Sequence, residues 1–118
     1  MPSGTELTEL MRRIIAFRDE RDWRRFHDPK NLAQAIGIEA AELQEIFLWK
    51  TNADSRHLSE TECKHVQEEL ADVFIYLMTL CHELNVDILE AVADKLKQNG
   101  EKYPVEKCRG SSAKYTKL

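Results

Sequence analysis

The chain has 118 residues, of which 32% are charged and 42% hydrophobic, with four glycines and three prolines, and this composition favours a small helical domain over turn-rich β structure. A net charge of −4 argues against a general nucleic-acid-binding protein, and three cysteines without C-x-x-C spacing argue against a disulfide scaffold or a zinc ribbon. No apolar run approaches the roughly 20 residues of a bilayer span and no apolar signal region begins the chain, so we expect a cytoplasmic protein that does not associate with membranes.

The first two predicted helices cover about residues 5–21 and 31–50. Apolar residues recur at helical spacing in the first, which makes it amphipathic. The segment between them, "HDPK", is predicted as a turn because Pro29 disfavours helical geometry in the residue before it. A polar loop, "TNADSRH", follows the second helix.

A third helix is predicted from about Glu60 to Leu84, since Ser59 and Glu62 have the spacing of a capping box and Asn85 is a suitable stop. The fourth helix follows Asp87 and ends near residues 99–100. Residues 105–118 are expected to be an irregular basic tail, which is either solvated or in contact with phosphates. We expect one domain over residues 1–118, with its core at about 5–104.

The third helix predicts self-association. One apolar stripe has the spacing of a helix-bundle seam, yet further apolar residues lie off that stripe, so the helix is apolar nearly all round. A four-helix chain of this length cannot easily enclose one of its own helices. We therefore expect an all-α, four-helix protomer that buries part of this helix against another copy of itself in a homo-oligomer. The off-stripe residues are Phe74, Ile75, Met78 and Cys81.

Two pairs of acidic residues, each spaced by three, are the main chemical signal. Glu39 and Glu42 share a face of the second helix, and Glu69 and Asp72 share a face of the third, inside the apolar segment "EELADVFIYLM". If the helices pack face to face, each carboxylate pair repels by roughly 3 kcal/mol at ~5 Å and an effective dielectric of ~20. Bound cations would remove that cost, and all-oxygen ligands suit Mg²⁺, or Mn²⁺, better than zinc.

Two alternatives to this metal site remain. Spaced acidic pairs are common on solvated helix faces, where they bind nothing. A ferritin-like di-iron bundle would need two E-x-x-H pairs, whereas the chain contains one, Glu62 with His65.

These residues resemble the MazG-like, all-α nucleoside triphosphate pyrophosphohydrolases. The E-x-x-E and E-x-x-D pairs resemble the acidic signature of that family. The segments "RDWRRFHDPKNL", "ELQEIFLWKT" and "EELADVFIYL" and the tail "SSAKYT" are similar to its dCTP pyrophosphatase branch, over roughly residues 18–118. The resemblance implies Mg²⁺-dependent hydrolysis of a deoxynucleoside triphosphate, dCTP or a modified dCTP above all, to the monophosphate and pyrophosphate. It also implies a homotetramer, with a dimer as the smaller alternative.

The resemblance assigns the metal to Glu39, Glu42, Glu69 and Asp72, with Glu42, and Glu39 beside it, as the candidate catalytic base. It assigns base and sugar contacts to Trp49, Tyr76 and the segment from Trp23 to His27. From the residues themselves, Trp23, Phe26 and Trp49 are candidates to sandwich a base. Phe26 can equally belong to the core, whereas the two tryptophans lie close to polar turns, where a core position is less expected.

Polar contacts to the substrate have weaker candidates. His27 or Asn31 is suited to discriminate cytosine, and Lys95, Asn99 and Lys102 share a face of the fourth helix, provided that the helix continues past Gly100. Arg109 and Lys114 are further candidates for the phosphates, and a plain solvated surface is the alternative for each lysine. The alternative for the whole chain is a non-catalytic helical oligomerisation or adaptor module whose acidic residues are ordinary surface.

Overall fold

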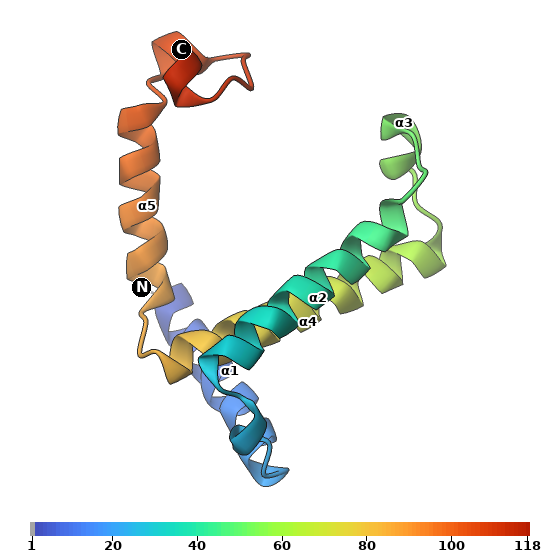
Figure 1. The fold of residues 1–118 in the computed structure, drawn as a ribbon, viewed down its shortest axis with the longest axis vertical. Helices are drawn as coiled ribbons and strands as arrows, with labels where there is room; N and C mark the ends of the chain where they lie inside the picture. Colours follow the sequence, from blue (N-terminus) through green and yellow to red (C-terminus); the bar gives the residue numbers. More distant parts are fainter. Residues whose placement is uncertain (1) are drawn as a thin grey trace. The chain divides into compact units, whose positions relative to one another are not determined.

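The computed structural model of the protein describes residues 2–118, with side chains from Thr5 onwards, and every regular element in that range is helical. The prediction of an all-α protein is therefore confirmed (Figure 1). The chain divides into two compact units, one ending at Asn85 and the other covering Val86–Leu118. The elements are α1 (Pro2–Glu20), η1 (Arg24–Phe26), α2 (Pro29–Phe47), α3 (Asn52–Ser55), α4 (Glu60–Glu83), α5 (Ile88–Lys102), α6 (Val105–Cys108) and η2 (Tyr115–Lys117).

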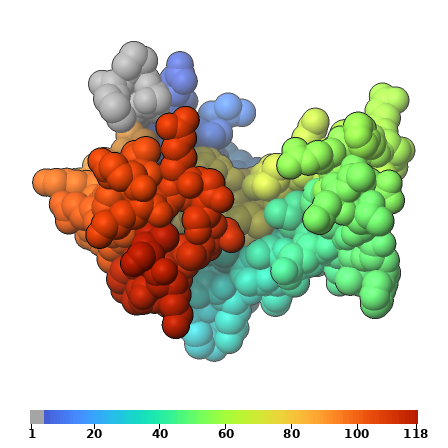
Figure 2. Space-filling model, turned by 90° about the horizontal axis from the view of Figure 1, so that it is seen from above, coloured from blue at the N-terminus to red at the C-terminus, as the bar shows by residue number. Residues whose placement is uncertain are grey.

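The first unit is built on α2 and α4, which run side by side in opposite directions (Figure 1). The short helix α3 lies at the end where the chain turns back, in the green segment of Figure 2. The first helix, α1, packs on α4 near the other end of this pair. The most buried side chains come from these three helices: Ile14 of α1, Leu32 of α2, and Met78, Thr79 and Cys81 of α4. The core of this unit therefore lies toward the α1 end of the hairpin.

The capping box predicted at the start of α4 is confirmed. The Ser59 hydroxyl accepts a hydrogen bond from the Glu62 backbone N–H at 3.1 Å, and the Glu62 carboxylate accepts one from the Ser59 N–H at 3.0 Å. Glu62 also pairs with the ammonium of Lys50, 2.5 Å away, just beyond the end of α2. The bond from Lys50, followed by the bonds with Ser59, lowers the pKa of Glu62 to about 2. This cluster ties the ends of α2 and α4 together across the connecting segment.

Besides shifts of two or three residues at the ends of α2 and α5, three features of the secondary structure differ from those predicted. Helix α2 begins at Pro29 rather than after it. Proline suits the first helical position, because a backbone N–H at that position would have no acceptor within the helix. The polar connection contains the short helix α3, which begins where the Thr51 side chain accepts a hydrogen bond from the Asp54 N–H at 3.0 Å. The tail after residue 104 is not wholly irregular, since it contains the short helices α6 and η2.

The second unit consists of α5 and the tail. Asp87 caps α5 by accepting a hydrogen bond from the Glu90 N–H, as its spacing predicts. The helix continues past Gly100 to Lys102. Lys95, Asn99 and Lys102 therefore lie on one face of α5, because their spacings of four and three are helical. Two contacts hold the tail to the end of α5: the Tyr115 ring stacks edge-on against Tyr103, and the Lys102 ammonium lies 4.9 Å from the Tyr115 ring centre.

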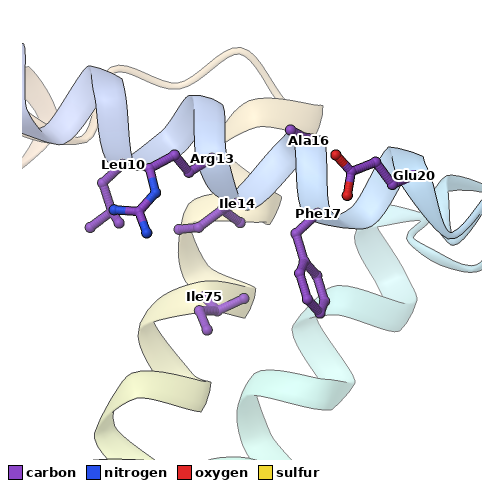
Figure 3. Close-up of a pocket in the computed structure, with 7 residues that line it drawn as sticks. All are labelled: Leu10, Arg13, Ile14, Ala16, Phe17, Glu20 and Ile75. Atoms are coloured by element: carbon purple, nitrogen blue, oxygen red, sulfur yellow. The ribbon is translucent and has the colours of Figure 1, made fainter.

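A groove of about 510 Å³ with a mainly apolar lining lies between α1 and α4. Figure 3 shows Ile14 and Phe17 of α1 extending toward Ile75 of α4, with Arg13 and Glu20 at the edges. Phe17 and Ile75 are exposed in this chain, as are Leu70 of α4 and Leu84, the residue directly after α4. The expectation that another copy covers part of α4 stays a prediction. None of the helices in the described range combines the length and apolar character that a bilayer-spanning segment requires.

Candidate active site

Three carboxylates meet between α2 and α4. Glu39, Glu69 and Asp72 each place one oxygen within 4.8 Å of the other two, with Glu39 and Glu69 half-buried and Asp72 exposed. The antiparallel packing of α2 against α4 brings these distant parts of the chain together. Glu42, the fourth predicted ligand, is exposed and lies outside this group of three, but it is near enough to Glu39 to affect its ionisation.

Glu39 is poorly suited to carry a charge without a cation. Burial, together with the neighbouring carboxyl groups of Glu69, Glu42 and Asp72, raises the pKa of Glu39 from 4.5 to about 7. One buried oxygen of Glu39 and one of Glu69 have no hydrogen-bond partner among the described residues. Buried oxygen atoms left without partners, beside a third carboxylate, fit a hard divalent cation well.

A pocket of about 320 Å³ adjoins this carboxylate cluster. Glu39 and Asp72 form part of its wall, and the predicted contact residues Trp23, His27 and Tyr76 also line it. The rings of His27 and Tyr76 stack edge-on with centroids 6.2 Å apart, and Trp23 stacks in the same manner on Phe17 of α1 at 5.8 Å. The pocket therefore joins acidic oxygens to an aromatic surface, which is the combination needed for a metal-bound phosphate attached to a flat ring.

The remaining predicted residues lie elsewhere. Phe26 is 61% exposed, and the Asn31 side chain donates a hydrogen bond to the Phe26 carbonyl at 3.1 Å, which fixes η1 to the start of α2. Trp49 is 92% exposed just beyond α2, in a left-handed backbone conformation with φ of 69°. None of these three lines the pocket described above. Lys95, Asn99 and Lys102 belong to the second unit.

Two polar residues of the pocket were not predicted from the sequence. Arg18 is 3% exposed, and its guanidinium pairs with Glu83 of α4 and with Asp19. Thr79 is also buried, and its hydroxyl donates to the Ile75 carbonyl at 2.7 Å. The sequence contained a signal for Arg18, because it follows Ile14 by four residues and so continues the apolar face of α1.

The first unit thus has the features of a metal-dependent hydrolase, with a carboxylate cluster between two antiparallel helices and an aromatic pocket beside it. A model of the MazG-like family matches residues 34–118. The dCTP pyrophosphatase 1 of Rattus norvegicus is 42% identical over 95% of this chain and 67% of its own length, and the Homo sapiens protein gives the same values. A crystal structure of a pyrophosphatase from Archaeoglobus fulgidus superposes with a TM-score of 0.80 and 43% identity, over 84% of this chain and 93% of that one.

The chain belongs to the MazG-like family. The resemblance noted from the acidic pairs and aromatic segments is confirmed, and so is the prediction that the protein is a pyrophosphohydrolase enzyme.

Proposed function

We propose that the protein hydrolyses a deoxynucleoside triphosphate, dCTP or a modified dCTP, to the monophosphate and pyrophosphate in the presence of Mg²⁺. The observation that carries this proposal is that Glu39 and Asp72 belong both to the carboxylate cluster and to the wall of the aromatic pocket. The names of the mammalian relatives support dCTP as the substrate. The role is that of a cytoplasmic enzyme that removes unwanted nucleotides.

Glu39, Glu69 and Asp72, with Glu42 beside them, are the residues that would hold Mg²⁺ or Mn²⁺. A divalent ion bound there supplies positive charge that neutralises the triphosphate oxygens and lowers the pKa of a bound water. Because Glu39 and Glu69 are half-buried while Asp72 is exposed, the cluster is open on the side of Asp72, where a phosphate has access.

The carboxylates also handle the proton of the attacking water. In the proposed reaction the water oxygen bonds to the α-phosphorus, the bond from that phosphorus to the bridging oxygen breaks, and pyrophosphate leaves. Glu42 is the proposed base, since its exposed carboxylate is accessible to water and lies beside Glu39. Glu39, the neighbour of Glu42 in the cluster, is the second proposed catalytic residue.

The aromatic residues provide the proposed base and sugar contacts. Trp23, His27 and Tyr76 line the pocket beside the cluster, and stacking on such rings is worth ~1–3 kcal/mol per base. The other proposed contacts, which do not line this pocket, are Phe26, Asn31, Trp49, Lys95, Asn99 and Lys102. We propose that residues 1–118 act as one functional domain.

We further propose that the enzyme is a homotetramer, or at least a dimer. The apolar groove between α1 and α4 (Figure 3) adds to the exposed Leu70 of α4 and Leu84 directly after it. Together they leave a large apolar surface in contact with water along and beside α4. Burying this surface against a second copy removes it from water. Analytical ultracentrifugation of the purified protein tests this, and a monomer at micromolar concentration would contradict it.

The reaction is tested with purified protein, Mg²⁺ and a panel of the common deoxynucleoside and ribonucleoside triphosphates, followed by product analysis. We expect dCTP to give dCMP and pyrophosphate. Release of orthophosphate from the terminal position, or no turnover of any nucleotide, contradicts the proposal, and the second result would favour a helical adaptor module.

A further inference from the structure

Arg18 is a buried cation on the wall of the substrate pocket, and the proposed chemistry does not use it. It comes from α1, whereas the metal-binding carboxylates come from α2 and α4. Its side chain is almost completely enclosed, in contrast to Arg12, which is exposed one and a half turns earlier on the same helix. Burying a guanidinium is costly unless its hydrogen bonds are satisfied, so its position in the pocket calls for an explanation.

The known partners of Arg18 hold it in place without using all of its donors. Its Nε donates to Asp19 Oδ1 at 3.0 Å, Nη2 lies 3.0 Å from the same oxygen, and Nη1 donates to Glu83. A guanidinium carries five N–H groups, so at least two donors remain beyond these contacts. Glu83, itself largely enclosed, anchors the group from α4. The result is a fixed fork of donors rather than a flexible surface cation.

The guanidinium belongs to the part of the pocket near His27 rather than to the carboxylate cluster. Its ion pairs within the described range go to Glu83 and Asp19, and none goes to Glu39, Glu69 or Asp72. It lies close enough to His27 to help lower the pKa of that ring, although burial is the larger cause. His27 Nδ1 is buried there without a hydrogen-bond partner in the described residues. A polar ligand bound in this part of the pocket would supply the hydrogen-bond partner that His27 Nδ1 lacks.

We infer that Arg18 is a specificity-determining residue that hydrogen-bonds the acceptor edge of the substrate's base. This inference rests on the proposed function, in which the cluster holds the triphosphate and the aromatic residues hold the base. Among the pyrimidines, cytosine presents two adjacent acceptors, O2 and N3. Uracil and thymine have an N–H at position 3, which would oppose an Arg18 donor. A donor fork held by Glu83 and Asp19 therefore favours cytosine over the other two, whereas stacking alone does not distinguish them.

The wild-type enzyme provides the first test, with dCTP, dUTP, dTTP and 3-deaza-dCTP, in which a C–H replaces N3. We expect kcat/KM to fall roughly 10- to 100-fold from dCTP to the deaza compound, as for the loss of a hydrogen bond to a charged group. Equal values for the two substrates would overturn the inference. If the enzyme converts no deoxynucleoside triphosphate to monophosphate and pyrophosphate, the proposed function itself fails, and the two failures are thus distinguishable.

The second test combines Arg18→Met with Glu83→Gln, which removes both charges together and so avoids leaving one buried alone. We expect this double variant to lose activity on dCTP and to treat dCTP and 3-deaza-dCTP alike. An equal loss on both substrates, with the wild-type ratio retained, would show that Arg18 only supports the fold and would overturn the inference. Arg12→Met is the matched control, with an unchanged ratio expected. If the double variant does not fold, equal values for dCTP and 3-deaza-dCTP in the wild type would still overturn the inference.

Discussion

Glu39 on α2 and Asp72 on α4 place carboxylate oxygens within 4.8 Å of each other, in a group that also contains Glu69. The repulsion in this group raises the pKa of Glu39 on top of the effect of burial. Function and stability therefore make opposite demands on these residues, because removing a carboxylate relieves the repulsion and also removes a proposed metal ligand. The predictions for Asp72→Asn and for the pH dependence of stability follow from the repulsion between these carboxylates.

The substitution Asp72→Asn should abolish most of the pyrophosphohydrolase activity while the metal-free protein keeps or gains stability. The amide has nearly the same shape, but it removes one charge from the cluster. Activity is measured as pyrophosphate release from dCTP, and stability by urea unfolding in a chelating buffer. Glu68→Gln, on the exposed surface of the same helix, is the control and should change neither. Near-normal turnover by Asp72→Asn would show that the metal assignment is wrong.

The metal-free protein should become less stable as the pH rises from about 4.5 to about 7. Burial and neighbouring carboxyl groups raise the pKa of Glu39 from 4.5 to about 7 in the folded state, so that between these values the folded chain binds more protons than the unfolded chain. The free energy of unfolding should fall across this window and then level off above pH 7.

The variant Glu39→Gln tests the source of that pH dependence, since an amide does not titrate. Urea unfolding of both proteins in a chelating buffer, at half-unit steps from pH 4.5 to 8, gives the comparison. The decline should be much smaller in the variant. Parallel curves for the two proteins would mean that other groups cause the pH dependence.

Ser59→Ala should destabilise the protein by about 1 kcal/mol, because it removes the hydroxyl that caps α4. The same cluster contains Glu62, whose pKa is lowered from 4.5 to about 2, chiefly by the hydrogen bond from Lys50. The stabilisation from Glu62 is therefore present above about pH 4.5 and is lost as the pH falls toward 2. Thermal unfolding measures the first effect, with Ser112→Ala, an exposed serine outside the capping box, as the control. An unchanged melting temperature for Ser59→Ala would show that the connection at α3 does not depend on this cap.

Trp49→Gly should separate stability from function. A tryptophan with φ of 69° and a 92% exposed side chain is strained by roughly 1–3 kcal/mol and gains little from packing in this chain. Glycine relieves the strain but costs about 0.5–1 kcal/mol of chain entropy, so stability should hold or rise by about 1 kcal/mol. If Trp49 stacks on the base, kcat/KM should fall about tenfold or more in both Trp49→Gly and Trp49→Ala. Full activity in both variants would remove Trp49 from the site.

Local signals in the sequence predicted the four long helices and most of their ends. Ser59 with Glu62 and Asp87 with Glu90 are capping patterns whose hydrogen bonds lie within three residues, so no tertiary information was needed. The short helix α3 was missed, although Thr51 and Asp54 have a similar spacing, because the polar composition of that segment favours a loop. The acidic pairs were recognisable because carboxylates are unusual within an apolar helix.

Arg18 could not be recognised in the same way. Its position on the apolar face of α1 was visible, but its partner Glu83 lies 65 residues further along the chain, and only the packing of α1 on α4 brings them together. The left-handed conformation of the exposed Trp49 was also not predicted, since neither adjacent residue is a glycine or an asparagine. Contacts between distant segments therefore account for most of what the sequence left open at the site.

The central claim is that carboxylates from α2 and α4 jointly bind a divalent cation. Calorimetric titration of the metal-free protein with Mn²⁺ tests it most directly, with Glu69→Gln for comparison and Glu68→Gln as the control on the adjacent exposed position. The wild type and the control should bind Mn²⁺ alike, and Glu69→Gln should bind at least about tenfold more weakly while remaining folded. Equal Mn²⁺ affinity for all three proteins, or no binding by the wild type, would contradict the account.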